Sequence, residues 1–128
     1  MMCAMNLIAQ ILAVLVGVLL IGVGVLEVFF YRDQRFNKIF LIKPQDADAV
    51  RLWTVNVGFY NILMGIATIV GVVLVNMGQV DAGRAIVWFV CISHFILGIT
   101  LALVEPRLWK STIGESGLPL LTMIALLF

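Results

Sequence analysis

Three long apolar runs dominate the sequence, and each is long enough to cross a lipid bilayer as a helix. They cover residues 7–30, 52–75 and 85–104. A membrane-spanning helix needs about 20 mainly apolar residues, because each residue advances it by about 1.5 Å through roughly 30 Å of hydrocarbon. The mean hydropathy of +1.17 and the 63% of hydrophobic residues also lie outside the range of soluble domains. We therefore expect a polytopic membrane protein.

A fourth apolar run covers residues 112–128 and is interrupted by Pro119. It is near the lower length limit of about 17 residues, and we predict that it also spans the membrane. The first run is expected to be retained, because MMCAMN lacks the basic residues of a signal peptide and no cleavage site follows. The predicted fold is all-α. One transmembrane domain, residues 1–128, forms a four-helix bundle with spans at about 7–30, 52–75, 85–104 and 112–128.

The basic residues are distributed unevenly between the connecting loops. Of the 8 Lys and Arg residues, all except Arg84 lie in segments 31–51 and 105–111. Because loops rich in Lys and Arg stay in the cytoplasm, we predict that both segments are cytoplasmic and both termini are outside. In a bacterium this means the inner membrane. The net charge of +1 is too small to indicate nucleic-acid binding.

Cysteine usage argues against a disulfide framework and against a zinc site. Cys3 and Cys91 are far apart, and neither belongs to a CxxC or Cys/His spacing. The sequence also contains no nucleophile elbow, phosphate-binding loop or redox dithiol. We predict no metal and no cofactor, and whether the protein is an enzyme stays open.

Six polar residues within or beside the spans are the candidate site residues. Counted from the cytoplasmic end of each span at about 1.5 Å per residue, Asn61 lies about 13 Å deep and His94 about 15 Å deep. All six fall in the cytoplasmic half. A polar group facing lipid would cost several kcal/mol, so these side chains are expected to face the interior. The six residues are Glu27, Asn56, Tyr60, Asn61, His94 and Glu115.

Helical spacing predicts the surroundings of these residues. Glu27 continues a stripe of small residues that contains Gly17 and Gly24, and His94 shares a stripe with Gly98. Such stripes let helices approach closely, within one chain or between the copies of a homo-oligomer.

The second span presents two polar faces about 140° apart. One carries Asn56 and Tyr60, and the other carries Asn61 between Gly58 and Gly65. This arrangement predicts that the helix contacts two neighbours through polar groups.

Structural interpretations compete with functional ones at several of these positions. Asn56 and Tyr60 would serve simply as interhelical hydrogen-bonding groups. Glu27 would be neutralised if Arg32 or Arg35 reached back from the adjoining loop.

The start of the fourth run has two structural interpretations of its own. Thr112 and Glu115 have the spacing of a capping box, Thr-x-x-Glu, which would explain the carboxylate by itself. Pro119 leaves the carbonyl of Glu115 without its helical donor, which predicts either a packing bend or a docking point for a ligand.

Three motifs resemble those of a family of small bacterial four-helix membrane proteins of unknown function. They are Glu-Val-Phe-Phe at 27–30, Asn-Val-Gly-Phe-Tyr-Asn at 56–61 and Gly-Leu-Pro at 117–119. Val57 stands where that family tends to have glutamine. The resemblance implies a four-span fold and points to Glu27, Asn56, Tyr60 and Asn61, but it implies no activity.

The leading functional hypothesis is a membrane-embedded protein that binds a membrane lipid or another small amphiphile in a pocket open to the cytoplasmic half of the bilayer. Asn56, Tyr60 and Asn61 would hydrogen-bond the polar group of that molecule. Glu27 and His94 are the acid and base candidates if the molecule is converted.

Two other classes stay open. A small proton-coupled exporter acting as a dimer would also carry a carboxylate in its first span, although Glu27 lies near one membrane face rather than at the centre. A structural or accessory subunit would use the same polar groups only for packing.

Overall fold

The computed structural model describes residues 4–128, except the side chains of residues 37 and 38, and it is entirely helical in its regular structure. Three helices are long and apolar enough to cross a membrane. They are α1 (Leu7–Phe29), α3 (Ala47–Asn76) and α4 (Val80–Val104). The three long apolar helices predicted from the sequence are thereby confirmed. Both α3 and α4 begin five residues before the predicted spans, because polar residues extend each helix beyond its apolar run.

The fourth run is less regular than predicted. It consists of α5 (Trp109–Thr112), a π-helical segment (Ile113–Gly117) and α6 (Leu118–Leu126). The remaining regular elements are α2 (Asn37–Phe40) and two 3₁₀ turns, Pro44–Asp46 and Pro106–Leu108.

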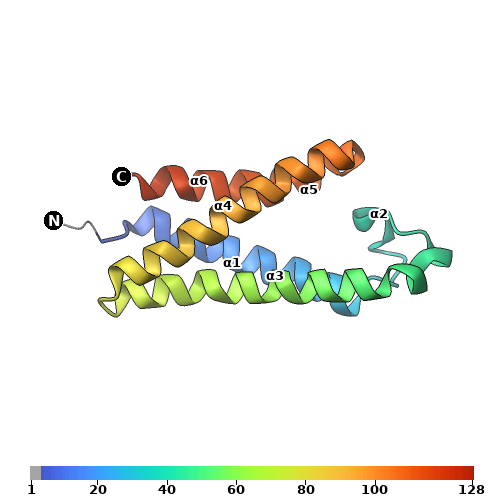
Figure 1. Ribbon diagram of the computed structural model, residues 1–128, viewed down its shortest axis with the longest axis horizontal. Coiled ribbons are helices and arrows are strands. Elements are labelled where there is room, and N and C mark those ends of the chain that lie inside the picture. Colours follow the sequence, from blue (N-terminus) through green and yellow to red (C-terminus); the bar gives the residue numbers. More distant parts are fainter. Residues whose placement is uncertain (1–3) are drawn as a thin grey trace.

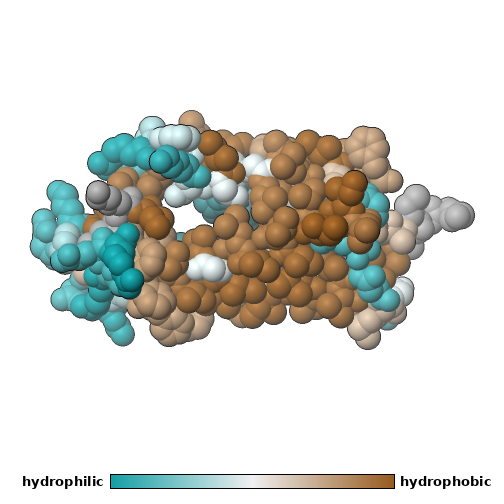
Figure 2. Space-filling view, turned by 180° about the vertical axis from the view of Figure 1, so that it is seen from behind, coloured by the Kyte–Doolittle hydropathy of each residue, from teal (hydrophilic) through white to brown (hydrophobic). Residues whose placement is uncertain are grey.

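The helices form an elongated bundle with two different ends (Figure 1). At one end, here called the terminal end, lie the beginning of α1, the C-terminus and the turn between α3 and α4. The other end carries residues 30–46 and 105–112 and is called the basic end, after its arginines and lysines. A broad apolar belt separates polar groups at the two ends in Figure 2, as expected for a protein in a bilayer.

Glycines bring the long helices into close contact. A Cβ atom added to Gly24 of α1 would lie 2.5 Å from the carbonyl oxygen of Gly58 in α3, and one added to Gly65 would lie 2.5 Å from that of Gly17. Gly71 of α3 meets α4 in the same way, since its added Cβ would lie 2.9 Å from the Gly83 carbonyl oxygen. The predicted small-residue faces are therefore confirmed, and helices of the same chain occupy them.

The terminal end contains the larger apolar core and is closed by hydrogen bonds between helices. Asn6 donates to the Ala125 carbonyl at 2.7 Å, and Arg84 donates to the Leu126 carbonyl at 3.1 Å. These bonds attach the end of α6 to the beginnings of α1 and α4. The core beneath them comprises Met5, Ala9, Ala13, Val72, Val75, Val87, Cys91 and Leu126.

Candidate functional site

Toward the basic end, α1 and α3 bring Glu27 and Asn61 together. The Nδ2 atom of Asn61 donates a hydrogen bond to Oε2 of Glu27 at 3.0 Å. The contact lies beside the close crossing of Gly24 and Gly58, where a side chain at Gly58 would collide with the Cβ atom of Glu27. The two helices therefore hold the amide and the carboxyl group by backbone packing, and both side chains are half-buried.

A second pair joins α4 to the π-helical segment. Nδ1 of His94 lies 3.5 Å from Oε1 of Glu115, and the His94 side chain is only 3% exposed. This separation exceeds the 2.7–3.2 Å of an N–H···O hydrogen bond. Nδ1 has no hydrogen-bond partner among the described residues. Gly98 allows the close approach, because its added Cβ would lie 2.6 Å from that of Ser116.

The π-helical segment places Glu115 against His94, and the capping-box interpretation of Thr112 and Glu115 is wrong. The helix has already begun at Trp109, so Thr112 has helical dihedral angles (φ −58°, ψ −45°) and its side chain caps no backbone N–H. Its hydroxyl oxygen is buried without a hydrogen-bond partner within the described part of the chain. The wider π turn comes directly before Pro119, which cannot donate to the Glu115 carbonyl.

The two pairs form one group of side chains, here called the polar cluster: Glu27, Asn61, His94 and Glu115. They lie beside one small apolar core, in which Leu20 of α1, Met64 of α3, Val90 of α4 and Leu118 of α6 pack together. Within the described residues, no hydrogen bond or ion pair joins Glu27 to His94 or to Glu115. Four separate elements contribute to the cluster, and the apolar helices around it place it within the bundle rather than on a loop.

The other two candidates lie elsewhere. Asn56 is exposed, and so is Tyr60, which is 60% exposed. Neither makes a side-chain hydrogen bond within residues 4–128, so the expectation that both face the interior is wrong for the single chain. The reason is geometric: α3 turns its Gly58 and Asn61 face toward α1, and α4 diverges from the opposite face toward the basic end.

The arginines predicted to neutralise Glu27 have other partners. Arg32 forms an ion pair with Asp48 at 2.6 Å, and Arg35 forms one with Asp33 at 2.8 Å. Hydrogen bonds from Arg35 lower the pKa of Asp33 to about 2. Neutralisation of Glu27 by either arginine is therefore wrong. Among the ion pairs of the described residues, only the contact between His94 and Glu115 involves the polar cluster, and it lies within the cluster.

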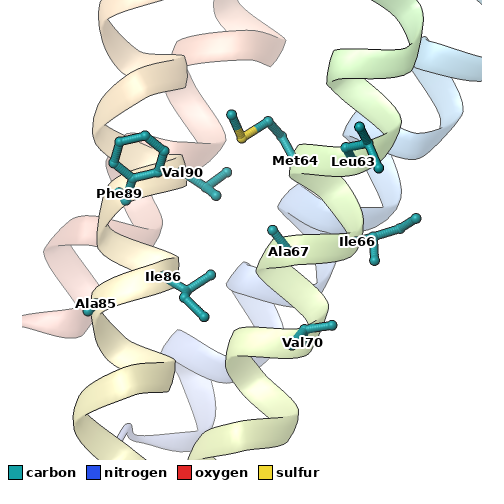
Figure 3. A pocket seen from close by; sticks show the side chains of 9 residues that line it. All are labelled: Leu63, Met64, Ile66, Ala67, Val70, Ala85, Ile86, Phe89 and Val90. Carbon is teal, nitrogen blue, oxygen red and sulfur yellow. The ribbon is translucent and has the colours of Figure 1, made fainter.

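An apolar groove of about 510 Å³ runs between α3 and α4 and ends near the polar cluster. Met64 is three residues from Asn61, and Val90 is four residues from His94, so each lies about one helical turn away. Figure 3 shows Met64, Ile86 and Val90 pointing into the space between the helices. In Figure 2 an opening separates the α4 side of the molecule from the α1 and α3 side near the basic end. The groove could not be predicted from the sequence, because its lining residues are apolar and cannot be told apart from side chains that face lipid.

The polar cluster does not have the arrangement of a metal centre. Within the part of the chain that the structure describes, no three or more His, Cys, Asp or Glu side chains are grouped to hold a metal ion. What the cluster offers is two carboxyl groups, an amide and an imidazole nitrogen. These groups can accept hydrogen bonds from a ligand or exchange protons with it.

Comparison with known proteins identifies the family and no activity. No curated protein and no solved structure matches the chain. The sequence model of one family matches residues 14–127, nearly the whole length, and includes every residue of the polar cluster. The resemblance to a family of unknown function is confirmed by this match. The chain belongs to the family described as "Protein of unknown function (DUF1304)".

Proposed function

We propose that this protein is a four-span membrane protein that binds a small amphiphile in the polar cluster. The polar group of the ligand would contact Glu27, Asn61, His94 and Glu115, and its chain would lie in the groove between α3 and α4. The distribution of Lys and Arg supports an orientation with the basic end in the cytoplasm and both termini outside. In a bacterium the protein would lie in the inner membrane.

The observation that carries this proposal is the buried Nδ1 atom of His94, which has no hydrogen-bond partner among the described residues and faces the carboxyl group of Glu115. A buried polar atom without a partner costs about 1–3 kcal/mol, so native proteins rarely keep one without a role. Ionisable residues within spans are also rare and usually functional. A bound polar group would satisfy Nδ1 and would explain why four elements converge at this point.

The apolar groove explains why an amphiphile suits the site better than a water-soluble molecule. Its lining comes from Leu, Ile, Val, Ala, Met and Phe side chains. An alkyl chain in the groove would stay in the hydrocarbon while its head reached Asn61 and His94 about one turn away. Entry would be lateral, through the opening near the basic end. If the molecule is converted, Glu27 and His94 would be the acid and the base.

The closed terminal end favours binding over export. A dimeric exporter needs its site to be reached alternately from both sides of the membrane. Here the apolar core and the hydrogen bonds of Asn6 and Arg84 lie between the polar cluster and the terminal end. Access from that end would require these contacts to break.

A structural or accessory subunit is the second candidate, and one observation favours it. Asn56 and Tyr60 are exposed on α3 at a depth where polar groups facing lipid are costly. A second chain packed on this face would satisfy them. Asn56→Leu would then disturb assembly while leaving ligand binding unchanged, and the opposite is expected of Asn61→Leu.

Native mass spectrometry of the purified protein, with extraction of small molecules, tests the proposal. Wild type is expected to retain a molecule that Asn61→Leu and Glu27→Gln lose at unchanged oligomeric mass. Glu105→Gln is the matched control, because Glu105 pairs with Arg107 beyond the end of α4. Equal retention by all four proteins, or no retained molecule in wild type, would contradict binding at the cluster. Loss of an oligomer in the variants would favour the structural subunit.

A further inference from the structure

We propose that the head group of the bound amphiphile is a primary ammonium, held between Glu27, Glu115 and His94. This inference rests on the proposed function and adds the chemical class of the ligand. A primary ammonium has three N–H donors and no acceptor. Each of these three side chains has an acceptor atom: a carboxylate oxygen of Glu27, one of Glu115, and Nδ1 of His94.

The charge of the cluster favours a cation. The cluster brings two carboxyl groups, one from α1 and one from the π-helical segment, into an apolar bundle beside a shared apolar core. Charges removed from water are stable only when they are paired and hydrogen-bonded. Three arginines at this end, Arg32, Arg35 and Arg107, form ion pairs with Asp48, Asp33 and Glu105 instead. A bound cation would supply the missing positive charge.

His94 gives independent support for a ligand that donates hydrogen bonds. Its side chain is 3% exposed, and its Nδ1 atom faces Glu115 at a distance too long for an N–H···O hydrogen bond. As a neutral imidazole, with the proton on Nε2, it presents a free acceptor at Nδ1. An ammonium between His94 and Glu115 would donate to both.

The arrangement disfavours other head groups. A carboxylate or phosphate would meet two carboxyl groups of the same charge. An alcohol has one donor for three acceptors, and it brings no charge. A quaternary ammonium would match the charge but would donate no hydrogen bond to His94. The primary ammonium is the head group that satisfies both the charge and the acceptor count.

Equilibrium binding of tritiated decylamine to the protein in lipid nanodiscs, with empty nanodiscs as the baseline, tests this inference. An alkylamine is protonated at neutral pH, as the lysine side chain is. We expect saturable binding above the baseline, which unlabelled decanol and decanoate displace about tenfold less effectively than unlabelled decylamine. Glu27→Gln and Glu115→Gln should each raise the Kd by about tenfold, since each loses a charge-assisted hydrogen bond. Glu105→Gln should leave it unchanged.

The outcomes separate the two proposals. If decanol or decanoate displaces the label as well as decylamine does, amphiphile binding stands and the ammonium inference is overturned. The inference also fails if neither glutamine variant weakens decylamine binding. If decylamine does not bind saturably, tritiated decanol and decanoate are measured in the same way: binding of either one overturns only the ammonium inference, and binding of none overturns the proposed function as well.

Discussion

The two ends of this bundle use polar side chains in opposite ways. At the terminal end, Asn6 and Arg84 donate to backbone carbonyls of α6, and an apolar core fills the space beneath them. Toward the basic end, Nδ1 of His94 lies 3.5 Å from the carboxyl group of Glu115 and has no hydrogen-bond partner among the described residues. Polar groups at the first end are satisfied by the protein. In the polar cluster Asn61 and Glu27 pair with each other, and under the proposed function a ligand would satisfy Nδ1 of His94.

This difference suggests that stability and binding are divided between the ends. Strained or unsatisfied groups persist in a fold only where other contacts compensate for them, and binding sites are where they collect. Substitutions at the terminal end should therefore unfold the protein. Substitutions in the polar cluster should change binding while leaving the fold intact.

The largest effect is expected for Gly83→Val, where α4 crosses α3. A side chain here would collide with the Gly71 carbonyl and with Val75, both fixed in the core. We expect a loss of about 3 kcal/mol in the free energy of unfolding, measured by SDS titration of the reconstituted protein. Gly22→Ala is the matched control, because nothing lies within 4 Å of its added Cβ. A G83V protein as stable as this control would contradict the packing at the crossing.

Arg84→Gln should lower the free energy of unfolding by less, about 1.5 kcal/mol, because it removes one charge-assisted hydrogen bond to the Leu126 carbonyl. The same titration measures it. Arg107→Gln is the comparison at the basic end, where the ion pair with Glu105 is open to water and little change is expected. Equal destabilisation by the two substitutions would remove the contrast between the ends.

Glu115→Gln should leave the free energy of unfolding unchanged or raise it by up to about 1 kcal/mol. The substitution removes one ionisable carboxyl group from the apolar bundle and keeps the size of the side chain. Thermal melting in nanodiscs checks the stability of Glu115→Gln, and decylamine binding to the same samples checks that its affinity falls. A clear loss of stability would show that the polar cluster holds the bundle together.

The smallest effect is expected at Asp33. Its pKa is lowered to about 2 by hydrogen bonds from Arg35, so the stabilisation is fully present above the ordinary value of 3.8. It is lost as the pH falls through about 2. The melting temperatures of wild type and Asp33→Asn should therefore differ by a small amount that stays constant between pH 8 and pH 4. A difference in melting temperature that grows or vanishes within this range would mean that Asp33 titrates above pH 4.

Much of the fold could be predicted from sequence, because long apolar runs and glycine spacing act locally. The crossing of Gly24 and Gly58 follows from the small-residue stripes, and so does the meeting of Glu27 with Asn61. The outward position of Asn56 could not be predicted. It depends on how far α4 diverges from α3, which no residue of α3 specifies.

The contact between Glu115 and His94 could not be predicted from the sequence either. Periodicity assumes 3.6 residues per turn, and the π turn at Ile113–Gly117 changes the direction of every side chain within it. Pro119 was the available signal, since it breaks the regular hydrogen-bond pattern at that point. It predicted a disturbance without giving its form.

The central claim is that an amphiphile from the bilayer reaches the polar cluster, and His94 can report this directly because it is the single histidine of the chain. Solid-state NMR of ¹⁵N-histidine-labelled protein in bilayers would observe one imidazole, with and without decylamine. We predict that its Nδ1 resonance moves on addition of decylamine and that Glu115→Gln reduces the change. An imidazole spectrum unaffected by saturating decylamine would contradict the account.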